Sequence, residues 1–264
     1  VKAGCFLLIK LSPLFLVFPV ASAMVVLIGG LTFCLASFMA ISQSNAKRVL
    51  AYSTIANLGL IVACAGVGTP EAVWAAIFLV IFHAVAKSLL FLCVGTAEHH
   101  IGSRDIEDMG PGCSSACRVS PRFMMLGILC MFIAPFGMLL AKWATLVSFA
   151  DTGQVALIVL LAFGSAATFM FWAKWLGKLS GIAARPENVE AKVHSSEWVA
   201  IMVMAVLVIL CCIGLPIISW AVVEPYIYSV FGTVGQDISS SNLWIASILS
   251  AFIAVVLFAG LGRS

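Results

Sequence analysis

The chain has 264 residues, of which 63% are hydrophobic and 9% are charged, and its mean hydropathy is +1.17. Soluble domains carry about 25% charged residues, so this composition excludes a water-soluble globular protein and indicates one that lies in a lipid bilayer. The net charge of +3 is too small to indicate a nucleic-acid partner.

Apolar runs of roughly 20 residues, long enough to cross a bilayer, recur along the sequence. Lipid permits only helices or a closed barrel to span it, and these runs show no alternation of apolar and polar residues, so we expect helices. The predicted fold class is all-α, a polytopic transmembrane helix bundle. Pro, Gly and charged residues divide it into eight segments: 1–17, 20–41, 46–67, 72–96, 121–150, 154–177, 197–221 and 242–261.

Two of these segments have special features. The first opens inside an apolar run without an initiator Met, so we expect residues 1–19 to be the end of a truncated transmembrane helix. The fifth is too long for one crossing and carries Pro135 and Gly137 near its middle. Proline removes a helical hydrogen bond and clashes with the preceding turn, so we expect two half-helices joined near residues 134–137.

Basic residues are distributed unequally over the two ends of the segments. One side would hold Lys47, Arg48, Arg104, Arg118, Arg122, Lys178, Arg185, Lys192 and Arg263. The other would hold Lys10, together with Asp151, Glu224 and Asp237. Because cytoplasmic loops carry the excess of Lys and Arg, we expect the loops 97–120 and 178–196 and the C-terminus to face the cytoplasm. We also expect the membrane to be a prokaryotic inner membrane.

Aromatic and basic side chains follow one another at the end of the sixth segment: Trp172, Lys174, Trp175 and Lys178. Indole rings at headgroup level beside lysines that reach towards water are typical of an anchor at the membrane interface. We prefer this interpretation to a transport role for Lys174.

Three basic side chains fall inside apolar runs, and a fourth, Lys47, lies near a helix start. His83 and Lys87 stand four apart in "FHAVAKSLLF" (82–91), so they share one helix face, and Lys142 lies just past Gly137. A charged lysine at the bilayer centre costs at least about 2.5–3.5 kcal/mol, and such residues normally mark ion pathways. The alternative is that one of them snorkels or caps a carbonyl, which suits Lys47 best.

Imidazole and amine groups in this setting suit proton transfer. Histidine titrates near neutrality and can accept a proton on one ring nitrogen and release it from the other. Burial and repulsion between neighbouring cations favour a neutral amine, so at least one of Lys87 and Lys142 is expected to be neutral at pH 7. We expect Lys47, Lys87 and Lys142 to point into one shared interior, with His83 between them.

Three motifs in order carry a specific resemblance: "AKRVLAYSTIANLGL" (46–60), "FHAVAKSLLFLCVGT" (82–96) and "PFGMLLAKW" (135–143). They resemble the antiporter-like subunits of respiratory complex I, of Mrp Na+/H+ antiporters and of energy-converting [NiFe] hydrogenases. The opening "VKAGCFLLIKLSPLF" is also similar to the eighth helix of that family, so the resemblance covers about 1–178. Details such as "FWAKWLGKL" (171–179) look more like the hydrogenase branch.

The resemblance implies a fold of two inverted five-helix repeats, each with one broken helix. Residues 20–177 would be the second repeat, and 178–264 a cytoplasmic loop with C-terminal transmembrane helices. By motif, the resemblance also implies a proton path through Lys47, His83, Lys87 and Lys142, in which Lys142 provides the exit.

Two positions depart from the family pattern. Asn45 stands where the family often has Asp, and Leu79 stands where many members have a further His. The path is therefore expected to contain fewer titratable groups than is usual in the family, with Asn45, Ser53, Thr54 or water in support.

The leading functional hypothesis is a proton-translocating, or Na+/H+, subunit of a redox-driven complex related to NADH dehydrogenase or hydrogenase. The chain holds neither an Fe–S ligand set nor a nucleotide-binding loop, so we expect no cofactor and no catalytic redox site within it. Its partners would be other membrane subunits and a peripheral redox module. The alternatives are a structural subunit that does not conduct and a stand-alone secondary transporter.

Nine cysteines are scattered through the sequence, most of them in apolar runs where a thiol behaves as a small hydrophobe. Cys113 and Cys117 lie in a loop, but a single C-x3-C pair is a weak metal signal. We therefore expect no metal site.

Overall fold

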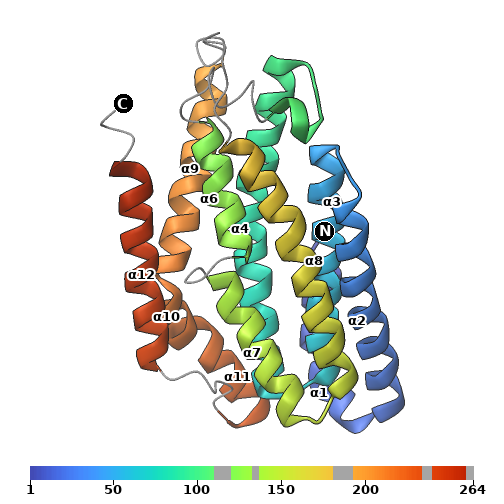
Figure 1. Ribbon diagram of the computed structural model, residues 1–264. Coiled ribbons are helices and arrows are strands. Elements are labelled where there is room, and N and C mark those ends of the chain that lie inside the picture. The colour runs from blue at the N-terminus through green and yellow to red at the C-terminus, as the bar shows by residue number, and fades with distance from the viewer. Residues whose placement is uncertain (110–119, 133–136, 181–192, 234–239, 260–264) are drawn as a thin grey trace.

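The computed structural model describes residues 1–109, 120–132, 137–180, 193–233 and 240–259. Within these ranges the chain is helical, without a β-strand, and forms one bundle (Figure 1). The all-α prediction is confirmed. The elements are α1 (Ala3–Val17), α2 (Pro19–Ile41), α3 (Ala46–Val67), α4 (Pro70–Ile101), α6 (Ser120–Phe132), α7 (Gly137–Asp151), α8 (Val155–Leu179), α9 (Ser195–Ile213), α10 (Leu215–Ile218), a π-helical turn (Ser219–Val223), α11 (Glu224–Phe231) and α12 (Ser240–Ala259).

The ends of the central helices follow from the local sequence. Asn45 caps α3, because its side chain accepts a hydrogen bond from the Arg48 backbone N–H at 3.2 Å, and Thr69 caps α4 in the same way. The glycines that follow these two helices, Gly68 and Gly102, take left-handed backbone conformations with φ of 74° and 77°. Only glycine adopts such a conformation without strain, so α3 and α4 end where the sequence provides one.

The fifth predicted segment corresponds to two helices, α6 and α7. The first ends at Phe132 and the second begins at Gly137. Residues 133–136 and the loop cysteines Cys113 and Cys117 lie outside the described residues. The non-helical connection and the state of the thiol pair therefore stay predictions.

The prediction of one continuous helix over 197–221 is wrong. Helix α9 ends at Ile213, and α10, the π-helical turn and α11 follow at an angle to it (Figure 1). The cause is the sequence "GLP" at 214–216, because Pro216 lacks a backbone N–H and its ring clashes with the preceding turn. The chain therefore turns beneath the bundle before α12 returns alongside α9.

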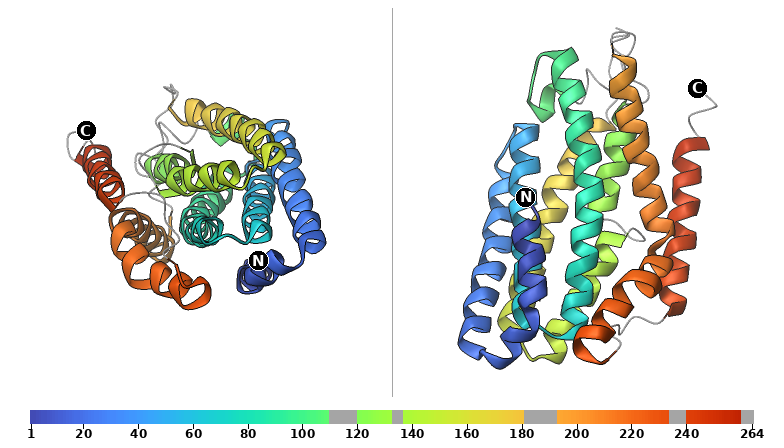
Figure 2. Two further views of the ribbon diagram at one scale, coloured as in Figure 1. Left: turned by 90° about the horizontal axis from the view of Figure 1, so that it is seen from below. Right: turned by 180° about the vertical axis from the view of Figure 1, so that it is seen from behind.

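Helices α3, α4 and α7 occupy the middle of the bundle (Figure 2, left). Helices α1, α2 and α8 cover one side of them, and the elements from α9 to α12 cover another. Six spans are long and apolar enough to cross a membrane, counted over the described residues: α2, α3, α4, the α6–α7 segment, α8 and α9. The outer faces of α2, α9 and α12 expose large apolar side chains such as Leu27, Val203 and Ile248. These faces suit lipid or a neighbouring apolar protein surface.

Helices α2 and α3 approach closely at Gly29 and Gly59. A Cβ added at Gly29 would lie 2.5 Å from the Ala63 backbone nitrogen and 2.7 Å from the Gly59 carbonyl oxygen. Small residues at membrane helix contacts allow this approach, and backbone atoms cannot give way as a flexible side chain can.

We expect Gly29→Ala to destabilise the protein by about 1–3 kcal/mol, because the added methyl group must push the two backbones apart. Thermal unfolding of the complete protein in detergent measures the change. Gly95→Ala on α4 is the matched control, since nothing lies within 4 Å of its added Cβ. Equal loss of stability in both variants would contradict the close-approach account.

Candidate functional site

Lys87 lies in the interior of the bundle, on the face of α4 that packs against α3. Its side chain is buried, and its Nζ donates to the Leu50 carbonyl oxygen at 3.1 Å and to the Ser53 hydroxyl. Leu50 and Ser53 lie one turn apart on α3, so they offer two acceptors at one point of the helix surface. The α3–α4 contact therefore forms a polar seat for one amine.

The indole of Trp172, on α8, completes this seat. Lys87 Nζ lies 4.8 Å from the centre of the Trp172 ring, within the range of a cation–π contact. Trp175 stacks on Trp172 with ring centres 5.8 Å apart and planes inclined by 14°. Both indoles are 0% exposed.

The predicted interface anchor at Trp172 and Trp175 is therefore wrong. Both rings face the interior because α8 packs this side against the bundle, and a tryptophan near a helix end can serve either environment. The two lysines of the motif do lie at the surface. Lys174 and Lys178 both pair with the carboxylate of Glu107. The Lys174 Nζ lies 3.7 Å from Glu107 Oε1. The hydrogen bond from Lys178 holds the pKa of the Glu107 carboxyl below its ordinary value.

His83 lies one turn before Lys87 and is 1% exposed. Among the described residues neither ring nitrogen has a hydrogen-bond partner. Helix α7, which carries Lys142, packs against α4, so His83 and the two buried lysines belong to the same interior. Because buried polar groups are nearly always hydrogen-bonded, we expect ordered water at His83.

Lys142 is buried on α7, with its Nζ 5.8 Å from the centre of the Phe33 ring. It begins a row of polar side chains along α7. The Thr145 hydroxyl lies 3.4 Å from the Cys64 sulfur, and the Ser148 hydroxyl lies 3.1 Å from that of Thr69. We call Thr145, Ser148, Thr69 and the exposed Thr152 the α7 polar row; the Thr152 hydroxyl donates to the Ser148 carbonyl oxygen at 2.8 Å.

Lys47 does not share this interior, contrary to our expectation. It is the second residue of α3, its side chain is 45% exposed, and it pairs with the carboxylate of Glu98, which Arg104 also contacts. The reason is the position of Glu98 at the neighbouring end of α4. An ion pair near water avoids the cost of burying the ammonium group.

The three predicted supporting residues have different positions. Ser53 contacts Lys87 directly, whereas the Thr54 hydroxyl donates to the Leu50 carbonyl oxygen at 2.8 Å, the same oxygen that accepts from Lys87. Asn45 caps α3 at its end, away from the seat. The structure therefore brings Ser53 and, through Leu50, Thr54 to the site.

Asn57 is a polar residue of the interior that the sequence analysis did not single out. It is 1% exposed, its amide donates to the Ser53 carbonyl oxygen at 2.8 Å, and its Oδ1 has no partner within the described chain. Its spacing of four from Ser53 was the available signal, because it extends the polar face of α3 by one turn. Asn57 thus offers a further acceptor near the seat.

No carboxylate accompanies these amines in the interior of the described part of the chain. The buried polar side chains there are Ser12, Ser37, Ser53, Asn57, His83, Lys87, Lys142, Thr145, Ser148, Thr168, Ser219, Ser247 and Ser250. Among the described residues, Lys87 contacts two neutral oxygens and an indole, and Lys142 contacts a phenyl ring. This arrangement can hold a proton without trapping it in a buried ion pair.

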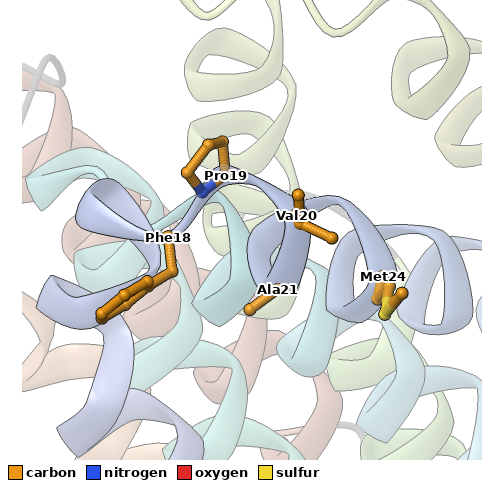
Figure 3. Close-up of a pocket in the computed structure, with 5 residues that line it drawn as sticks. All are labelled: Phe18, Pro19, Val20, Ala21 and Met24. Carbon is orange, nitrogen blue, oxygen red and sulfur yellow. The ribbon is translucent and has the colours of Figure 1, made fainter.

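A shallow hollow at the turn between α1 and α2 has a different character (Figure 3). Its lining is apolar and consists of Phe18, Pro19, Val20, Ala21 and Met24. It offers no group for acid–base chemistry, so the candidate site is the interior cluster of His83, Lys87 and Lys142.

The sequence profile of a transmembrane family described as NADH:quinone oxidoreductase/Mrp antiporter matches residues 1–169. The matched region contains all three members of the interior cluster. The chain belongs to this family.

Curated relatives come from both branches named in the family description. The chain is 29% identical to a subunit of the Na(+)/H(+) antiporter of Bacillus subtilis, over 89% of this chain and 32% of the relative. It is 38% identical to the NADH-ubiquinone oxidoreductase chain 5 of Paracentrotus lividus, over 52% of this chain and 21% of the relative. The chain thus spans about a third or less of these relatives.

Solved structures agree with this family fold. A chain of the Mrp complex from Dietzia sp. DQ12-45-1b superposes with a TM-score of 0.72 at 26% identity, over 100% of this chain and 30% of that one. A chain of the archaeal membrane-bound sulfane sulfur reductase, a respiratory membrane complex, superposes with a TM-score of 0.72 at 20% identity. The match covers 95% of this chain and 49% of that one. The protein is therefore an integral membrane protein whose relatives are subunits of multi-subunit membrane complexes.

Proposed function

We propose that this chain is the ion-translocating part of an antiporter-like membrane protein, in which Lys87, His83 and Lys142 relay protons. The observation that carries the proposal is the pair of lysines buried on the packed helices α4 and α7, with a buried imidazole one turn from Lys87. A buried amine without a fixed counter-ion can exist in both charge states, which a relay requires.

The positions of the groups along their helices support an order for the proposed path. Lys87 is seated between α3 and α4, and His83 lies one turn closer to the start of α4. From Lys142 the α7 polar row continues to Thr152, the first residue after α7, whose side chain is exposed. We propose that protons pass from Lys87 through His83 and water to Lys142, and leave along the α7 polar row.

The distribution of charge supports an orientation. The start of α3, the segment after α4, the start of α6 and the end of α8 carry Lys47, Arg104, Arg122 and Lys178, and these ends lie together. Because the cytoplasmic side is the richer in Lys and Arg, we propose that this end faces the cytoplasm. From the resemblance to the two-repeat family, we propose that residues 20–177 form the second repeat and that the membrane is a prokaryotic inner membrane.

The complex that contains the chain has two candidates. A redox-driven complex with a peripheral module is supported by the chain 5 relative, whose name is that of an oxidoreductase. A second candidate is Na+/H+ antiport in an Mrp-type complex. The observation that favours it is coverage, because the match to the Bacillus subtilis antiporter extends over 89% of the chain, whereas the chain 5 match covers 52%.

A His83 variant tests the relay against a purely structural role. In vesicles that contain the complete complex, we expect His83→Ala to reduce proton translocation at least about tenfold, because removing an acid–base group interrupts the transfer between the lysines. A pH-sensitive dye measures the rate, and co-purification of the other subunits measures assembly.

Ser88→Ala is the matched control, since the Ser88 hydroxyl is exposed on the same helix and donates only to the Ala84 carbonyl oxygen at 2.9 Å. The relay requires that His83→Ala loses translocation while assembly and the Ser88→Ala rate stay normal. Normal translocation by an assembled His83→Ala complex would favour a purely structural role.

A further inference from the structure

The Lys87 amine lies in a seat with three walls, two of them from α3 and one from α8. The Leu50 carbonyl and the Ser53 hydroxyl accept two of its hydrogen bonds, and the third wall is the face of Trp172 at 4.8 Å. An ammonium group has three N–H bonds, so each wall can face one of them. The Leu50 carbonyl and the Ser53 hydroxyl are ordinary hydrogen-bond acceptors, whereas the Trp172 ring face is not.

An aromatic face distinguishes the two charge states of a lysine more sharply than a hydroxyl does. The negative face of the ring attracts a cation, and an indole does so more strongly than a phenyl ring, whereas a neutral amine gains little from it. Ser53 can accept a hydrogen bond from either form of the amine. The Leu50 carbonyl and the indole therefore both favour the protonated amine, and the indole is the one whose attraction can be changed without altering a hydrogen bond.

Lys142 has a weaker version of the same arrangement. Its Nζ lies 5.8 Å from the centre of a phenyl ring, Phe33, close to the outer limit of about 6 Å for this contact. The two buried lysines thus differ in ring type, in distance and in the number of hydrogen-bond acceptors that they contact. In each of these three respects the contacts of Lys87 suit an ammonium group better than those of Lys142 do.

We propose that Trp172 is a positioning residue that stabilises protonated Lys87 in place of a carboxylate, so that the incoming proton resides there before it moves on. This inference rests on the proposed relay. An ion pair with Asp or Glu would hold the proton more strongly and slow its release, whereas a ring face stabilises the ammonium group less.

Other charged groups around the seat are few in the described ranges. His83 and Lys142 are the other basic groups of the described interior, and Lys2 lies just ahead of α1, which packs against α3 and α4. The helices around the seat carry most of their charged side chains near their ends: Lys47 and Arg48 on α3, Glu71 and Glu98 on α4, Arg122 on α6, Asp151 on α7, Lys174 and Lys178 on α8, Glu197 on α9 and Glu224 on α11. Lys10 is the exception, since it lies in the middle of α1. All of them keep their places when only the Trp172 ring is changed.

Fluorinated tryptophans test the proposal without changing the shape of the side chain much. Fluorine withdraws electron density from the ring face, so each added atom weakens the attraction for a cation. Analogues with one, two and three fluorines, inserted at position 172 of the complete complex, should move the alkaline limb of the proton-translocation profile to lower pH in graded steps. We expect a total shift of about 0.5–1 pH unit.

Trp74 provides the control, because it is buried on α4 and its ring N–H donates to the Ser219 hydroxyl at 3.1 Å. The same analogues there should leave the profile unchanged. A graded shift at 172 alone supports the proposal. An unshifted profile at 172, with or without a lower maximal rate, overturns it.

The Lys87→Ala complex, measured in the same vesicles, separates the two levels of the argument. If Lys87→Ala blocks translocation and the fluorinated series still gives no shift, only the role of Trp172 is wrong. If Lys87→Ala translocates normally, the relay itself is wrong, and the role of Trp172 falls with it.

Discussion

Replacing Lys87 with alanine is expected to abolish proton translocation by the complete complex while its subunits still assemble. The amine is the group on which α3, α4 and α8 converge, and the described interior contains no second titratable group in the same seat. Loss of a proton-transfer group lowers rates by about 10²–10⁴-fold. The measurement is proton uptake by vesicles, with co-purification as the test of assembly.

Lys87→Arg sharpens this test. Arginine keeps the positive charge but does not release its proton in proteins, so we expect this variant also to fail. Lys174→Ala is the control, because Lys174 is a half-exposed lysine on the outer end of α8. Wild-type translocation by Lys87→Arg would show that charge alone, without proton release, is sufficient, and it would contradict the relay.

Variants of Lys142 should show whether protons leave through this residue after they have arrived at Lys87. Two ammonium ions about 10 Å apart at an effective dielectric constant near 20 repel each other by about 1.7 kcal/mol, so a proton arriving at Lys87 favours release from Lys142. We expect Lys142→Ala to abolish translocation. Lys142→Glu should keep a measurable rate, since a carboxylate beside the α7 polar row can also accept and release a proton.

The same vesicle measurement checks both Lys142 variants. A Lys142→Ala complex that translocates at the wild-type rate would show that protons leave by another route. An inactive Lys142→Glu complex, correctly assembled, would show that the exit requires a cation specifically.

The helical class and most helix boundaries could be predicted because the bilayer leaves few choices. Length, apolar content and the glycines at 68 and 102 place α3 and α4 to within a few residues. The break after Ile213 was harder to predict. Its Gly-Leu-Pro sequence lies where an apolar run continues on both sides, and hydropathy does not distinguish a bend from a crossing.

The interior lysines could be predicted, but their surroundings could not. Burial of Lys87 and Lys142 follows from the cost of facing lipid with a charge. The positions of Lys47 and Trp172 depend on which residues neighbouring helices bring to them. Glu98 meets Lys47, and Lys87 meets Trp172, across sequence separations that no local pattern encodes.

A high-resolution map of the complete complex in lipid tests the central claim most directly, because the relay needs water between its fixed groups. We predict ordered water bound to a ring nitrogen of His83, with gaps of at most about two waters from Lys87 to His83 and from His83 to Lys142. Dry apolar side chains filling either gap, or the Lys87 amine turned towards lipid, would contradict a proton path through these three residues.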